Sequence, residues 1–210
     1  MIQGVVRFLD SAARVTLARA IETIENASAV EVVVTVRRRS SRYVHAHAIV
    51  AALCAFAGLA AMLYSSHPFA LSSILVDPFV AAALGAGAVA LAPQLERLLT
   101  PAAERHRRVT PAARATFVAH GVHATTGRSG LLVYVSWLER RVALVADLGL
   151  VRALPRGTLD HAEAVLTRAM RDGGAAMGKE LAALADTMAR AMPHRADDVN
   201  ELPDAIDSDE

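Results

Sequence analysis

A long apolar tract, from about Val44 to Leu91, constrains the fold of this chain more than any other feature. Its first half, VHAHAIVAALCAFAGLAAMLY, contains no Asp, Glu, Lys or Arg and has roughly the 20 residues that a helix needs to cross a bilayer. The second half follows an interruption at His67 and Pro68, and it has Asp77 and Pro78 near its start. We interpret the tract as a two-helix transmembrane hairpin. Two buried helices of an Ala-rich soluble core are the alternative, but such apolar runs are usually shorter.

Basic residues flank this tract on both sides, whereas the connection between its halves has neither Lys nor Arg. Because basic residues collect on the cytoplasmic side of membrane helices, we expect both termini and the soluble part in the cytoplasm. The interpretation is a multi-pass protein of the cell inner membrane. The expected anchors in membrane lipid are the aromatic residues at the two ends of the first helix and the basic residues before it: Tyr43, Tyr64, Arg37, Arg38, Arg39 and Arg42.

Composition limits what the rest of the chain can be. Of 210 residues, about 150 remain outside the membrane, which is enough for one soluble domain with its own core. The Arg clusters lack interleaved aromatic residues, so no nucleic-acid partner is expected. Cys54 is the single cysteine and lies in the apolar tract, so no internal disulfide is expected. The first residues, MIQGVVRFLD, do not have the pattern of a cleavable signal peptide.

Helical and strand patterns alternate in the soluble part. A helix is expected at 9–26, a strand at 28–36, a helix starting at Thr110 and Pro111, and two strands at 131–138 and 142–146. Two further helices follow Thr158 and end before Pro193. One strand is not stable alone, so the first strand should pair with the later two. The prediction is an α/β fold, a small sheet flanked by helices, with an inserted two-helix transmembrane hairpin.

The predicted domains follow from this arrangement. Residues 1–42 and 105–195 are the two parts of one α/β domain, residues 43–93 are the transmembrane hairpin, and residues 196–210 are an acidic tail. The tail is poor in large apolar residues, so most of it is expected to be mobile.

Three blocks of the sequence resemble a known family. They are AIETIENASAVEVVVTV at 20–36, ATFVAHGVHATTGRSGLLVYVSWLERRVALVADLGL at 115–150, and NELPD at 200–204. In the middle block a T-x-x-R-x-G break precedes a strand ending in E-R and a second strand ending in A-D-x-G. These blocks resemble the TPM domain family, also called DUF477, in its membrane-bound bacterial branch. The resemblance implies phosphatase-like activity, calcium binding, or a role in the assembly of membrane complexes.

Asp147 stands at the A-D-x-G position of this pattern. One interpretation is a metal-binding or catalytic carboxylate that Glu139 and Asp160 approach; the other is a strand-end carboxylate that accepts backbone N–H bonds beside Gly149. Calcium prefers six to eight oxygen ligands, and carboxylates are not clustered in the sequence. The Gly of the family's D-x-A-G-L-L pattern is also missing after Asp10. No cofactor is therefore expected, with a divalent cation such as calcium as the alternative.

Other candidate groups have weaker patterns. Thr126 and Arg128, with Thr125, either bind an anion or form an ordinary turn. His120 and His123 have helical i,i+3 spacing but no clear third zinc ligand. His45 and His47 have i,i+2 spacing, which does not point both rings at one metal, and they are interpreted as interfacial polar groups. Asp77 is either functional or the cap of the second membrane helix.

Two functions follow as hypotheses. The first is a membrane-anchored, non-enzymatic interaction or assembly module whose domain binds another membrane or cytoplasmic protein. The alternative is a phosphatase-like or metal-dependent hydrolase, on the family resemblance and on Asp147. Motifs for a serine hydrolase, a phosphate-binding loop and a C-x-x-C redox pair do not occur in the sequence. A pore is a distant third, because the two apolar helices offer almost no polar interior.

Overall fold

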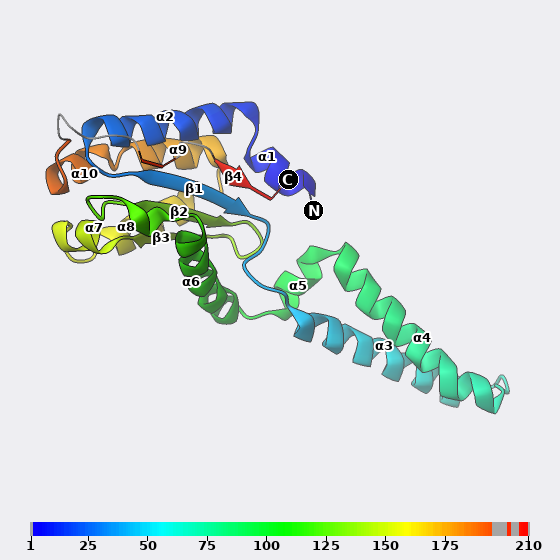
Figure 1. Ribbon diagram of the computed structural model, residues 1–210. Coiled ribbons are helices and arrows are strands. Elements are labelled where there is room, and N and C mark those ends of the chain that lie inside the picture. Colours follow the sequence, from blue (N-terminus) through cyan, green and yellow to red (C-terminus); the bar gives the residue numbers. More distant parts are fainter. Residues whose placement is uncertain (1, 195–200, 203–205, 210) are drawn as a thin grey trace. The chain divides into compact units, whose positions relative to one another are not determined.

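The computed structural model describes residues 2–194, 201–202 and 206–209 (Figure 1). Its elements are α1 (Ile2–Phe8), α2 (Ser11–Ala27), β1 (Val32–Arg37), α3 (Val44–Tyr64), α4 (Leu71–Leu91), α5 (Pro93–Leu99), α6 (Ala102–Ala119), η1 (Val122–Ala124), β2 (Leu131–Ser136), β3 (Arg141–Ala146), α7 (Leu148–Ala153), α8 (Thr158–Ala169), α9 (Gly174–Ala182), α10 (Ala185–Ala191) and β4 (Asp207–Ser208). They divide into an α/β unit, Met1–Ser41 with His106–Glu210, and a helical unit, Arg42–Arg105. The predicted α/β class is confirmed.

The sheet has the strand order β3-β2-β1-β4. β1 runs parallel to β2, with Val32 opposite Leu131 and Arg37 opposite Ser136. β2 and β3 form an antiparallel hairpin. The strand before the apolar tract therefore pairs with the strands after it, as the sequence predicts. Sequence analysis did not predict β4, in which Asp207 and Ser208 pair in parallel with the end of β1.

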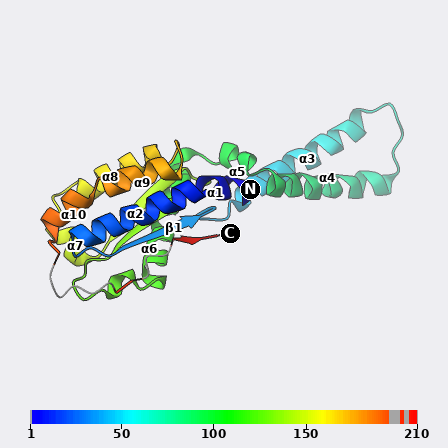
Figure 2. The ribbon, with the colours of Figure 1, turned by 90° about the horizontal axis from the view of Figure 1, so that it is seen from above.

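Both faces of this sheet are covered. Alternate residues of β1, Val32, Val34 and Val36, face a buried cluster formed with α2, α8, α9 and α10. The residues between them face the other way, and there Val33, with Leu132 and Tyr134 of β2, packs against α6. Strands that are apolar on both faces require this double cover. Figure 2 shows α2 and α9 side by side over the first face.

Close packing of α2 and α9 depends on two glycines. A Cβ at Gly174 would lie 2.7 Å from Cβ of Ala13, and one at Gly178 would lie 3.0 Å from the carbonyl carbon of Thr16. The spacing of four places both glycines on one side of α9. At the start of α2, the Asp10 carboxylate accepts a hydrogen bond from the backbone N–H of Ala13 at 2.7 Å, which caps this helix.

The helical unit contains the two apolar helices. α3 and α4 have 21 residues each, and by length and composition both can cross a membrane. Only 6% of the most apolar window of α3 and 11% of that of α4 is buried within this chain. A Cβ at Gly85 of α4 would lie 2.6 Å from Sγ of Cys54 in α3, so the helices approach closely at this glycine.

Two helix starts differ from the sequence predictions. α4 begins at Leu71 and has Ala70 at its N-cap, so Asp77 and Pro78 lie inside the helix and Asp77 is not its cap. α6 begins at Ala102 and continues through Pro111. The buried residues Val109, Ala113 and Phe117 have helical spacing across this proline. Their burial against the sheet offsets the backbone hydrogen bond that the proline removes.

Candidate functional site

The sequence-derived candidates for binding a metal or anion meet at one end of the sheet. Because Leu131 of β2 pairs with Ala146 of β3, the loop before β2 lies beside the residue that follows β3. Asp147 Oδ1 accepts a hydrogen bond from the backbone N–H of Leu148 at 2.7 Å and so caps α7. Arg128 Nη1 lies 3.6 Å from the same oxygen. The structure therefore brings Asp147 and Arg128 together as an ion pair.

Gly149 has a specific role in this loop. A Cβ on Gly149 would lie 2.6 Å from the carbonyl oxygens of both Gly127 and Arg128. The backbone N–H of Leu150 donates to the carbonyl of Arg128 at 3.2 Å. The A-D-x-G pattern thus has a local explanation, in which the aspartate caps α7 and the glycine lets α7 approach the loop.

Thr126 contacts Glu201, a residue of the NELPD block. Its backbone N–H donates to both carboxylate oxygens of Glu201, at 3.0 and 3.2 Å. Leu202 packs against the cluster under α6. The remaining residues of NELPD, at positions 200, 203 and 204, lie outside the described residues. The backbone N–H of Thr126 is therefore engaged by a carboxylate of the same chain.

The expectation that Glu139 approaches Asp147 is wrong. Glu139 lies in the turn between β2 and β3, at the other end of this β-hairpin. The length of β3 separates the two ends by about 16 Å. Asp160, in the first turn of α8, lines a hollow with Arg141 and Glu163. Among the residues that the structure describes, no group of three His, Cys, Asp or Glu side chains is placed to hold a metal.

A second polar cluster, which sequence analysis did not identify, lies where β1 and β2 end. Ser136 Oγ donates to Glu139 Oε2 at 2.5 Å, and the backbone N–H of Ser40 donates to Glu139 Oε1 at 3.0 Å. Ser40 Oγ lies 2.7 Å from Ser136 Oγ and 3.4 Å from the Tyr134 hydroxyl. Burial raises the pKa of Tyr134 above its ordinary value. The period-two spacing of Tyr134 and Ser136 on a strand was the available signal.

Arg37, one of the proposed membrane anchors, pairs with two carboxylates of the acidic tail. It ends β1, and its guanidinium contacts Asp207 Oδ2 at 2.5 Å and Asp209 Oδ1 at 3.1 Å. His120 Nε2 lies 3.1 Å from the same oxygen of Asp207. The acidic tail and a basic residue of β1 therefore form one ion-pair group at the edge of the sheet.

The other proposed anchors follow β1. Arg38, Arg39 and Arg42 lie between β1 and α3. Tyr43 packs edge-on against the His45 ring, and Tyr64, at the end of α3, is 92% exposed.

The histidines of the helical unit have separate partners. His47 Nδ1 lies 3.0 Å from the carbonyl oxygen of Ala86, and its Nε2 lies 3.1 Å from Glu96 Oε1. His45 Nε2 lies 3.0 Å from Thr100 Oγ1. The two rings therefore do not converge on one ion, in agreement with their i,i+2 spacing.

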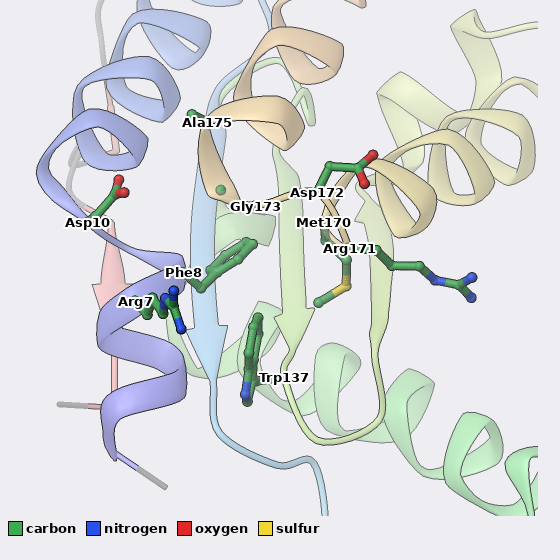
Figure 3. Close-up of a pocket in the computed structure, with 10 residues that line it drawn as sticks. Arg7, Phe8, Asp10, Trp137, Met170, Arg171, Asp172, Gly173 and Ala175 are labelled. Atoms are coloured by element: carbon green, nitrogen blue, oxygen red, sulfur yellow. The ribbon is translucent and has the colours of Figure 1, made fainter.

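A hollow of about 490 Å³ lies in the α/β unit beside the end of α1, the turn after β2 and the start of α9 (Figure 3). The rings of Phe8 and Trp137, 5.4 Å apart, form its apolar part, and the guanidinium of Arg140 lies 4.0 Å over the Trp137 ring. Figure 3 shows Arg171 extending away from these rings. Arg7, Asp10, Arg171 and Asp172 add charged side chains to its lining, so the hollow has both an apolar and a charged part.

Comparisons with known proteins agree with the fold. No family model matches the sequence, and no curated protein matches it. The structure is similar to the NMR structure of the BA42 protein from the psychrophilic bacterium Bizionia argentinensis, with a TM-score of 0.57 and 14% identity over 96% of each chain. At this identity the similarity concerns the fold alone.

Proposed function

We propose that this protein is a membrane-anchored member of the TPM domain family, whose α/β domain binds another protein instead of catalysing a reaction. The exposed apolar helices α3 and α4 support the anchoring, because so large an apolar surface is stable in lipid and not in water. In this proposal the protein spans the inner membrane twice and keeps both termini in the cytoplasm, where the Arg residues around the apolar helices contact lipid headgroups.

One observation favours a binding module over an enzyme, namely that the candidate reactive groups already have partners within the domain. Asp147, the residue that the family-like pattern selects for chemistry, already caps α7 and pairs with Arg128. The backbone N–H of Thr126, the other candidate anion site, is engaged by Glu201. Both groups stabilise the loop between α6 and β2. We therefore assign the A-D-x-G and NELPD patterns to the shape of the domain.

A phosphatase-like or metal-dependent hydrolase is the second candidate. The observation in its favour is the Oδ2 atom of Asp147, which is buried and has no hydrogen-bond partner among the described residues. A divalent cation at this oxygen would compete with the guanidinium of Arg128 for the same carboxylate.

The two candidates differ in one assay. The full chain, purified in mild detergent, is incubated with p-nitrophenyl phosphate with and without Ca²⁺, Mg²⁺ or Mn²⁺. We expect no metal-dependent turnover. Asp147→Asn is the sharp variant, because asparagine also caps a helix but is a poor metal ligand. Metal-dependent turnover that Asp147→Asn abolishes, in a variant that melts like the wild type, would overturn the binding module.

Partner binding and anchoring need their own measurements. We expect the full chain to stay in the membrane fraction after alkaline carbonate washing, and crosslinking in intact membranes to join it to one defined protein. Tags at both termini should resist protease added to the outside of spheroplasts. Recovery of intact protein from the cytosol without detergent would contradict the anchoring.

A further inference from the structure

The last strand of the sheet, β4, is short and is supplied by the acidic tail. It pairs with β1 at two residues, where Asp207 lies opposite Thr35 and Ser208 opposite Val36. The backbone N–H of Asp209 donates to the carbonyl of Val36 at 3.2 Å. Figure 1 shows this strand beside the end of β1. The tail thus extends the sheet in the same way as a peptide that binds by strand addition.

Side chains at this edge select for negative charge. Because successive residues of a strand point to opposite faces, Asp207 and Asp209 lie on the same face, and both contact the guanidinium of Arg37. His120, which directly follows α6, also contacts Asp207, through the same carboxylate oxygen as Arg37. Arg37, His120 and the backbone of Val36, which we call the edge site, therefore recognise the pattern Asp-x-Asp in an extended chain.

The hold on the tail is weak. The side chains of Asp207 and Asp209 are 37% and 44% exposed, and ion pairs at this exposure contribute little because water screens them. A ladder of two residues adds few backbone hydrogen bonds. The tail remains at the edge mainly because it is tethered, so its effective concentration is high. A partner segment with the same pattern and additional contacts can replace it.

We infer that the edge site docks an extended acidic segment of a partner protein, with carboxylates at alternate positions, and that the tail of this chain is the resident competitor. The inference rests on the proposed binding function and names the chemistry of its partner. The edge site lies at the end of β1, whereas Asp147 lies beside the start of β2. Since these strands are parallel, the two sites are at opposite ends of the sheet.

A labelled peptide tests this directly. The probe is fluorescein-labelled AIDSD, the sequence of residues 205–209, and its anisotropy is measured with the full chain in detergent. Two variants empty the edge site: a chain that ends at residue 204, and the full-length double variant Asp207→Asn with Asp209→Asn. We expect both to bind the peptide at least about tenfold more tightly than the wild type, whose own tail competes.

Matched controls define the contact. The amide peptide AINSN should bind at least about tenfold more weakly than AIDSD to the shortened chain. Arg37→Gln in the shortened chain should remove peptide binding, whereas Arg19→Gln on the exposed side of α2 should not. Thermal melts followed by the fluorescence of Trp137 verify that each variant is folded.

Two results would overturn the inference. One is a folded shortened chain that binds AIDSD no better than the wild type does, and the other is equal binding of AIDSD and AINSN. Either result removes the edge site and leaves the proposed function standing, because that function is judged by turnover at Asp147 and by crosslinking. Metal-dependent turnover with intact peptide binding would contradict the proposed function and leave the edge site standing.

Discussion

Gly149→Ala tests whether α7 needs its close approach to the loop before β2. The new Cβ would lie 2.6 Å from the carbonyl oxygens of Gly127 and Arg128, about 0.7 Å inside an ordinary carbon–oxygen contact. Both obstacles are backbone atoms, so relief requires movement of the loop or of α7. Overpacking of this kind lowers the free energy of unfolding by about 1–3 kcal/mol, and the higher helix propensity of alanine offsets up to about 1 kcal/mol of this loss. We expect a net loss of about 1–2 kcal/mol in the free energy of unfolding.

Trp137 makes the measurement specific, because it is the single tryptophan and lies in the α/β unit. Thermal unfolding of the full chain in detergent, followed by its fluorescence, should show a Tm lower by about 3–8 °C in Gly149→Ala. Gly127→Ala is the matched control in the same loop, since its Cβ would meet Ser129 Oγ at 3.4 Å, an ordinary contact. The control should change the free energy of unfolding by less than about 0.5 kcal/mol.

A Gly149→Ala protein that melts within about 1 °C of the wild type would refute this reasoning, because an overlap of that size must displace the backbone. Equal losses in both variants would also refute it. The loop would then be sensitive to any added side chain, and the close approach at Gly149 would have no special role.

Three further predictions concern other contacts. Asp147→Ala should lower the free energy of unfolding by about 1 kcal/mol through loss of the α7 cap, whereas Asp147→Asn should stay within about 0.5 kcal/mol of the wild type in urea unfolding; equal losses would exclude a capping role. Gly85→Leu should speed maleimide labelling of Cys54, because the added side chain forces α3 and α4 apart, and an unchanged labelling rate would contradict this packing. Burial raises the pKa of Tyr134 above 10.0, so the stability that depends on its neutral form is complete below about pH 10 and falls as the pH rises further. Tyr134→Phe should lack this loss of stability at alkaline pH. If the Tm values of the wild type and the variant fall in parallel between about pH 8 and pH 11, the prediction is wrong.

Much of the fold was predictable because its signals are local. The apolar tract, the β-branched run at β1 and the two runs at β2 and β3 each depend on a few neighbouring residues. The pairing of β1 with later strands followed from the instability of a single strand. Helix starts were less predictable, since the burial of Val109 and Phe117 carries α6 through Pro111.

The candidate site was only partly predictable. The pattern selected Asp147, Thr126 and Arg128, and the structure does bring Arg128 to Asp147. It also places Glu139 at the far end of the β-hairpin, because antiparallel pairing separates the turn from the free ends of the strands. A spacing of eight residues in the sequence therefore said little about distance.

The sequence determined where apolar length and strand propensity lie, and from these it determined a two-helix hairpin inserted into an α/β domain. Only the tertiary structure decided which polar groups meet: Glu201 with Thr126, Asp207 with Arg37 and His120. The physical reason is the distance along the sequence over which each kind of interaction acts. Periodicity and propensity act within a turn or a strand, whereas an ion pair between residues 37 and 207 depends on the register and packing of the whole sheet.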